Sequence, residues 1–83
     1  MKEQLEKLRE EALLLISGAE DFAALEGARV RFLGKKGELT AILKQMGSLS
    51  PEERPVIGQL ANAIREALDE AIASRRQYLE DKA

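Results

Sequence analysis

Two lysines between two glycines, in the order Gly34-Lys35-Lys36-Gly37, form the stretch of this sequence that comes nearest to a phosphate-binding loop. A nucleotide-binding loop of the common type needs a glycine five residues before its Gly-Lys pair and a serine or threonine after the lysine. Arg29 and Lys36 occupy those two positions. The sequence therefore excludes that loop and leaves two cations that could meet an anion by charge alone.

Other catalytic chemistry lacks the residues that it needs. The chain of 83 residues has neither cysteine nor histidine, which excludes a catalytic triad, a histidine general base and any metal site built on thiolate or imidazole. Neighbouring carboxylates such as Glu52 and Glu53, or Asp69 and Glu70, are adjacent in sequence and do not share a helical face. We interpret them as capping and solvated charges, and we predict no catalytic residue and no metal ligand.

The charges are unevenly distributed along the chain. The formal net charge is -2, yet the stretch from Gly27 to Gly47 holds five basic residues and a single acid, Glu38; the basic residues are Arg29, Arg31, Lys35, Lys36 and Lys44. A basic centre between acidic flanks indicates a polyanionic partner such as nucleic acid, and a chance cluster on a solvated surface is the alternative. With no tryptophan, one tyrosine and two phenylalanines, stacking on bases is disfavoured.

The composition predicts an all-α fold. Apolar residues make up 45% of the chain, charged residues 34% and aromatic residues 4%, and leucine and alanine dominate. We expect one small domain over residues 1–83 with a thin core. No apolar run approaches the ~20 residues of a membrane span, and no signal peptide is visible, so we expect a cytoplasmic protein without membrane contact.

A first helix is predicted over about residues 2–17. Its apolar residues recur at helical spacing, and Gly18 is a plausible stop; the stripe comprises Leu5, Leu8, Ala12 and Leu15, with Ile16 alongside. Leu13 and Leu14 widen the apolar surface beyond one seam. We therefore expect this helix to touch more than one neighbour and the isolated chain to form a homodimer.

A second helix is predicted over about residues 21–46, with Asp21 as its N-cap. Alternating steps of three and four place eight residues on one stripe: Phe22, Leu25, Arg29, Phe32, Lys36, Leu39, Leu43 and Met46. Gly27, Gly34 and Gly37 weaken it by about 1 kcal/mol each, so we expect the helix to be kinked or loosened near Gly34. The rival interpretation has a short extended piece at residues 30–33 and a turn at the glycines.

A third helix is predicted over about residues 51–82. Ser50, Pro51 and Glu53 form a capping box, and the apolar stripe has a period of eleven, which favours a nearly straight helix; it comprises Ile57, Ala61, Ile64, Leu68, Ile72, Arg75 and Leu79. The short turn before it predicts an antiparallel hairpin with the second helix. Because no glycine or proline ends this helix, we expect the chain to be the N-terminal fragment of a longer one.

Two motifs carry a resemblance to a known family. The stretch from Ala28 to Thr40 contains Phe32-Leu33-Gly34-Lys35-Lys36-Gly37, and the later stretch Leu49-Ser50-Pro51-Glu52-Glu53-Arg54 is followed by Gly58 and Asn62. Their order and spacing resemble the N-terminal domain of the bacterial phenylalanyl-tRNA synthetase alpha subunit. The resemblance covers nearly the whole chain, although the first helix is less diagnostic.

The resemblance implies a fold and a role. It implies an antiparallel coiled-coil arm of a heterotetramer with two alpha and two beta subunits, in which the arm contacts tRNA. The class II catalytic module, which binds ATP, magnesium and phenylalanine, would follow these residues, so the chain itself would be a non-catalytic appendage that positions tRNA for aminoacylation. The candidate tRNA-binding residues are Arg31, Lys35, Lys36, Arg65, Arg75 and Arg76.

Some alternatives remain open from the sequence. Arg31 and Lys35 share a helical face only if the second helix is continuous, and Arg29 and Lys36 could instead pair with acids of a neighbouring helix. The whole chain could be a coiled-coil association module that binds no nucleic acid. It could also be a small regulatory RNA-binding protein unrelated to the synthetase.

Overall fold

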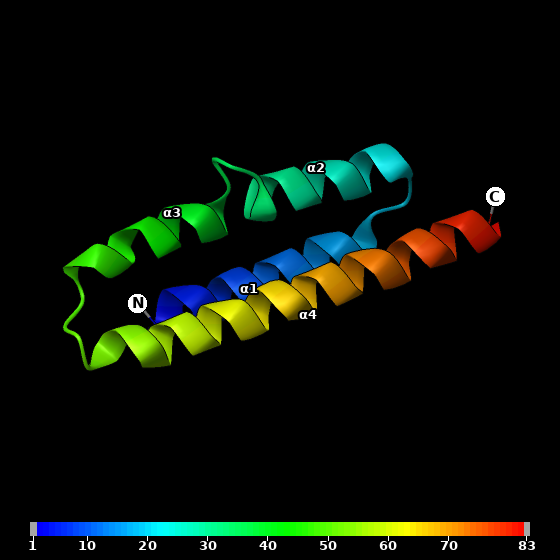
Figure 1. Cartoon of the computed structure of the whole chain (residues 1–83). Helices are drawn as coiled ribbons and strands as arrows, with labels where there is room; N and C mark the ends of the chain where they lie inside the picture. Colours follow the sequence, from blue (N-terminus) through cyan, green and yellow to red (C-terminus); the bar gives the residue numbers. More distant parts are fainter. Residues whose placement is uncertain (1, 83) are drawn as a thin grey trace.

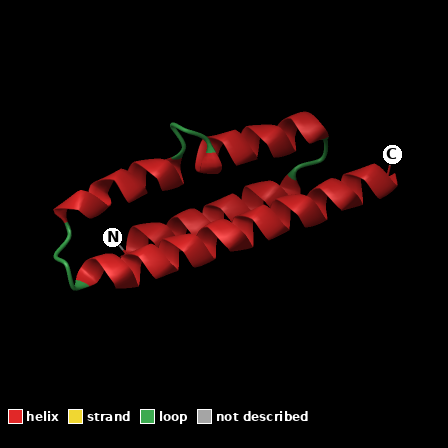
Figure 2. Cartoon of the chain, viewed as in Figure 1, coloured by secondary structure: helices red, strands yellow, loops and turns green. Residues whose placement is uncertain are grey.

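Helices account for almost all of residues 2–82, which are the residues that the computed structural model describes (Figure 2). No strand occurs in this range, so the predicted all-α class is confirmed. None of the described helices is both long and apolar enough to cross a membrane. The elements are α1 (Lys2–Gly18), α2 (Phe22–Leu33), α3 (Glu38–Lys44), the 3₁₀ helix η1 (Gln45–Ser48) and α4 (Glu53–Lys82).

The helices form an elongated bundle that measures 48 × 19 × 16 Å. α1 and α4 run side by side in the same direction, and α2 and α3 together run back antiparallel to both (Figure 1). The predicted hairpin, with an additional N-terminal helix, is therefore present. The pairing of α1 with α4 is the most extensive in the bundle, so the N-terminal helix is an integral part of the core.

The core is a single apolar cluster contributed by every α-helix, and within residues 2–82 it contains no buried polar or charged side chain. In α4 the predicted stripe is confirmed at all six apolar positions, and its arginine, Arg75, is half-buried. The buried residues are Leu5, Leu8, Ala12, Ile16, Ala19, Leu25, Ala28, Phe32, Leu39, Ile57, Ala61, Ile64, Leu68, Ile72 and Leu79.

The predicted stripe of α1 is wrong at one position. Leu15 is 42% exposed, and Ile16 is buried in its place. In a straight helix of 3.6 residues per turn, a strict alternation of three and four drifts around the axis, and the step of four from Ala12 to Ile16 returns the stripe to the bundle. Leu14 points to solvent and is 72% exposed.

The second helix, predicted over about residues 21–46 with a kink or loosening near Gly34, is interrupted completely at that point. α2 ends at Leu33, a turn follows, and α3 begins at Glu38. The Gly37 amide donates to the Gly34 carbonyl over 2.9 Å, which closes a turn in place of the next helical bond. The rival interpretation is right about the turn at the glycines and wrong about the extended piece, because residues 30–33 belong to α2.

The predicted heptad stripe is confirmed only in part. Leu25, Phe32 and Leu39 lie in the core, and Leu43 and Met46 pack against it. Phe22, Arg29 and Lys36 are exposed, and Ala28 is buried where Arg29 was expected. The apolar residues from Leu25 to Met46 therefore face the core on both sides of the turn.

Side-chain caps begin the two longer helices that follow a turn. The Ala24 amide donates to Asp21 Oδ1 over 2.7 Å, which confirms the predicted cap of α2. The Glu53 amide donates to Ser50 Oγ over 3.3 Å, so the predicted serine cap is present as well. α4 itself begins at Glu53, two residues later than predicted, because Pro51 and Glu52 form a turn.

Loss of the Ser50 cap should be measurable. We expect Ser50→Ala to lower the free energy of unfolding by about 1 kcal/mol, because the Glu53 amide then lacks its side-chain acceptor. Urea unfolding followed by circular dichroism measures this change in the free energy of unfolding. Ser17→Ala is the control, since the Ser17 hydroxyl donates to the Leu14 carbonyl on an exposed surface and caps no amide. Equal effects of the two changes would contradict a capping role.

Candidate nucleic-acid interface

Residues 34–37, called the lysine loop below, join α2 to α3 and carry the two lysines of the basic centre. Lys35 and Lys36 are both exposed. In Figure 1 the loop protrudes from the long side of the bundle, between the labels of α2 and α3. The turn between the two helices therefore presents two cations to solvent.

Contacts of the backbone hold the lysine loop against the end of α2. The Gly34 carbonyl accepts two hydrogen bonds of 2.9 Å, one from the Gly37 amide and one from Thr40 Oγ1. A Cβ atom at Gly37 would lie 2.7 Å from the carbonyl carbon and oxygen of Phe32, so only glycine allows this close approach. The charge pattern of the sequence indicates neither Thr40 nor the packing of Gly37, because neither residue carries charge.

Arg31 lies on the last turn of α2 and spans the lysine loop. Its Nε donates to Glu38 Oε2 over 3.1 Å, and the two side chains are about half exposed. An exposed ion pair of this kind contributes only about 0–1 kcal/mol, so an external anion can compete for the guanidinium. Arg31 also lines a groove between α1 and α2, beside Leu15 and Ala28.

Lys35 faces a different groove from Arg31. Together with Leu33, Thr40 and Leu43 it lines a groove that Arg65 of α4 completes from the other side. The predicted shared face of Arg31 and Lys35 depended on a continuous helix, and the break in that helix removes it. The fold instead brings together Lys35 and Arg65, which are far apart in the sequence.

The cations around the lysine loop differ in their partners. Within residues 2–82, ion pairs involve Arg29 and Arg31, and none involves Lys35, Lys36 or Arg65. A cation without a carboxylate partner keeps its full charge for an external anion. Lys35, Lys36 and Arg65 therefore form a group of candidate cations around the lysine loop without an ion pair among the described residues; Arg76, which has none either, lies farther along α4.

Arg29 pairs with an acid, as one alternative anticipated, but the acid lies on its own helix. Its Nε donates to both carboxylate oxygens of Glu26, over 3.0 and 3.1 Å. This hydrogen bond, with the positive charge of the guanidinium, holds the pKa of Glu26 below its usual value, and the same bond, with the negative charge of the carboxylate, raises the pKa of Arg29. Arg29 is therefore paired within α2.

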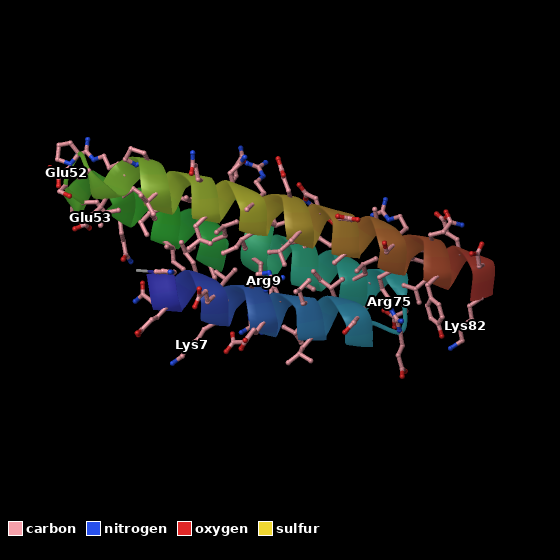
Figure 3. The ribbon with its side chains drawn as sticks, turned by 90° about the horizontal axis from the view of Figure 1, so that it is seen from below. Lys7, Arg9, Glu52, Glu53, Arg75 and Lys82 are labelled. Carbon is pink, nitrogen blue, oxygen red and sulfur yellow. The ribbon has the colours of Figure 1, made fainter. Side chains whose placement is uncertain are left out.

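Arg75 and Arg76 lie about 15 Å farther along α4 than Arg65, near the connection between α1 and α2. Arg75 Nε donates to the Ala19 carbonyl over 2.7 Å, and its guanidinium lies 4.3 Å from the centre of the Tyr78 ring (Figure 3). Arg75 thus ties α4 to the α1–α2 connection. Arg76 is exposed and close enough to Glu26 to lower the pKa of that carboxyl.

Among the described residues, the side chains around the lysine loop are suited to contacts with phosphates. Within residues 2–82, no group of three or more acidic, cysteine or histidine side chains is placed to hold a metal ion. The arrangement around the lysine loop has two exposed lysines on a hydrogen-bonded turn and one arginine on α4. Such a surface can bind a polyanion through its phosphates without reading its sequence.

Comparison with known proteins places the chain among synthetase domains. A family described as "Aminoacyl tRNA synthetase class II, N-terminal domain" matches residues 20–83. The phenylalanine–tRNA ligase alpha subunit of Halalkalibacterium halodurans is 54% identical over 80 residues, which cover 96% of this chain and 23% of that protein.

Further relatives are also alpha subunits of phenylalanine–tRNA ligases. The alpha subunit of the same ligase from Listeria monocytogenes serotype 4a is 54% identical over 83 residues, or 100% of this chain and 24% of the relative. That of Acetivibrio thermocellus is 57% identical over 79 residues, or 95% and 23%. The chain thus spans about a quarter of the length of the curated relatives that it matches.

Proposed function

The chain belongs to the family of class II aminoacyl-tRNA synthetase N-terminal domains, and from this premise we propose that it is the non-catalytic, tRNA-contacting arm of a phenylalanine–tRNA ligase alpha subunit. The alternative of a small RNA-binding protein unrelated to synthetases is wrong, because the family match covers residues 20–83. The proposed role is to hold tRNA while a catalytic domain elsewhere in the ligase transfers the amino acid.

The observation that carries this proposal is the lysine loop. Lys35 and Lys36 are exposed on a closed turn, Arg65 lies across the groove from Lys35, and none of the three has an ion-pair partner within residues 2–82. Cations of this kind bind the phosphates of an RNA backbone. Specific reading of RNA bases usually requires stacking aromatic rings, which are scarce here, so we propose contacts that position tRNA and do not read its bases.

The chemical steps belong, in this proposal, to other parts of the enzyme. The chain covers about a quarter of its relatives, which leaves room for a catalytic domain that would bind ATP, magnesium and phenylalanine. The partners that we propose are tRNA, a beta subunit and a second alpha subunit. The proposed location is the cytoplasm, where aminoacylation supplies protein synthesis.

Reversing the charge of Lys35 in the complete ligase should separate tRNA binding from catalysis. We expect Lys35→Glu to raise the KM for tRNA about tenfold, because a charge-assisted phosphate contact becomes a repulsion. The rate of phenylalanine activation, measured by ATP–pyrophosphate exchange without tRNA, should stay unchanged. Steady-state aminoacylation at low salt gives the KM for tRNA.

Lys7→Glu is the matched control for this experiment. Lys7 is an exposed lysine of α1 whose side chain points away from the bundle (Figure 3). Its reversal changes the net charge by the same amount and should leave the KM for tRNA within about twofold. An unchanged KM in Lys35→Glu, or an equal rise in both variants, would show that the lysine loop does not contact tRNA.

One observation favours a second candidate function, a module for protein association. A largely apolar groove of about 480 Å³ lies between α1 and α4, and Leu14 on its edge is 72% exposed. When a second molecule covers an exposed apolar surface on a small helical bundle, the free energy of the bundle falls. The groove is lined by Leu13, Leu14, Ile16, Ser17, Ala71, Ser74, Arg75 and Tyr78.

Sedimentation equilibrium of the 83-residue chain tests this second candidate. We expect the average mass to rise above that of a monomer as concentration increases, because Leu14 leaves the apolar surface of α1 uncovered. Leu14→Gln should restore the monomer mass without loss of helix content. A monomer mass at all concentrations in the unaltered chain would remove the association module and leave the tRNA arm.

A further inference from the structure

We propose that Thr40 is a positioning residue for the lysine loop, whose hydroxyl fixes the turn that presents Lys35 and Lys36 to phosphates. This inference rests on the proposed contact between the lysine loop and tRNA. It adds an uncharged residue to the interface. Thr40 would act through the lysines, without a contact of its own to the nucleic acid.

A single backbone carbonyl, that of Gly34, holds the lysine loop closed. The Gly34 carbonyl oxygen accepts from the Gly37 amide and from Thr40 Oγ1, each over 2.9 Å. A carbonyl has two acceptor positions, so this oxygen is fully used. The Gly34 amide in turn donates to the Val30 carbonyl over 3.1 Å. The turn is therefore anchored to α2 at its start and to α3 through the threonine hydroxyl.

The hydrogen bond of Thr40 joins two helices and is partly shielded from solvent. Thr40 is half-buried, and its hydroxyl reaches back six residues, from α3 to the end of α2. The hydroxyl bonds of Ser17 and Ser48 span only three residues and are exposed to solvent. A bond that is shielded from water and joins two elements holds a turn more firmly than an exposed local bond.

Without the Thr40 hydrogen bond, the composition of the lysine loop would favour flexibility. Glycines flank both lysines, and glycine has the largest conformational freedom of all residues. A turn that is already ordered loses less conformational entropy when it binds than a turn that must be ordered at that moment. Removing the hydroxyl should therefore weaken binding although every positive charge remains.

Binding of the full 83-residue chain to an unmodified tRNA transcript with a phenylalanine anticodon tests the inference. Fluorescence anisotropy gives the affinity between about 50 and 200 mM salt. Thr40→Val keeps the shape of the side chain and loses the donor. We expect it to bind about three- to tenfold more weakly at every salt concentration, which corresponds to ordering about one backbone residue.

The salt dependence distinguishes positioning from charge. Thr40→Val should leave the slope of log affinity against log salt unchanged, because the number of phosphate contacts in the complex is the same. Lys35→Ala should reduce that slope by about 1, since it removes one phosphate contact. Thr40→Ser, which keeps the hydroxyl, should restore affinity to within about twofold. A threonine that only supported folding would not produce this pattern.

Ser48→Ala is the matched control, because it removes a hydroxyl-to-carbonyl bond of 2.7 Å that lies outside the lysine loop. It should bind as the unaltered chain does. Circular dichroism at the binding temperature checks that each variant is folded. If Thr40→Val unfolds the chain, Thr40→Ala replaces it in the same comparison.

The outcomes separate the inference from the proposed function. If Lys35→Ala lowers affinity and slope while Thr40→Val binds as the unaltered chain does, the positioning role alone is overturned. Failure of Thr40→Ser to restore binding, or a loss of slope in Thr40→Val, overturns it as well. If Lys35→Ala changes nothing, the contact between the lysine loop and tRNA is overturned, and the role of Thr40 with it.

Discussion

Replacing Leu68 with alanine is expected to lower the free energy of unfolding by about 2–4 kcal/mol, the largest effect of the changes considered. Leu68 is fully buried on the central part of α4 and belongs to the cluster to which α1, α2 and α3 also contribute. Truncation removes apolar burial and leaves a cavity between helices that cannot fully close. In a domain of this size the Tm should fall by at least about 8 °C.

Val56→Ala is the control for Leu68→Ala. Val56 lies on the same helix and is 62% exposed, so its truncation should change stability by less than about 0.5 kcal/mol. Urea unfolding of both variants, followed by circular dichroism at 222 nm, gives the comparison. Similar small changes in both variants would mean that the side of α4 carrying Leu68 does not face the core.

Gly37→Ala is expected to lower the free energy of unfolding by about 1–3 kcal/mol, because the new methyl group has no space. The backbone angles of Gly37, φ −71° and ψ 164°, are open to any residue, so the cost is steric. The added Cβ would lie 2.7 Å from Phe32 backbone atoms, which cannot swing aside as a flexible side chain can. The lysine loop would have to move away from α2.

Gly27→Ala is the control for Gly37→Ala, because it should change the free energy of unfolding in the opposite direction. Gly27 lies within α2, and a Cβ there meets nothing within 4 Å. Alanine in a helix interior is favoured over glycine by about 1 kcal/mol, so this variant should be more stable than the unaltered chain. Stabilisation by both alanines would support the continuous helix over residues 21–46 that the heptad spacing predicted, and it would contradict the turn at residues 34–37.

Much of the fold can be predicted from the sequence because the information is local. The stripe from Ile57 to Leu79 identifies the buried side of α4, and the caps at Asp21 and Ser50 depend on residues within three positions of their partners. The one error in α1, Leu15 for Ile16, reflects the choice between a step of three and a step of four. That choice depends on where the neighbouring helices lie, which spacing alone does not specify.

The break between α2 and α3 is the main feature that spacing alone misjudged. The apolar and basic residues continue in heptad order through Gly34 and Gly37, so the pattern is equally compatible with a helix. The turn prevails because the Gly34 carbonyl gains two donors and Gly37 fits against Phe32. These contacts exist only once α2 and α3 have packed on the rest of the bundle.

The all-α class, the buried side of α4, the lack of cysteine and histidine chemistry, and the basic residue types that could meet phosphates can all be predicted from the chain. These properties follow from composition and from spacing within one helix. The grouping of the cations depends on the fold: Lys35 lies with Arg65 across a groove, Arg31 with Glu38, and Arg75 with the Ala19 carbonyl. The partner of each charge is set by the turn at residues 34–37 and by the packing of α4, because both bring together residues that are separated along the chain.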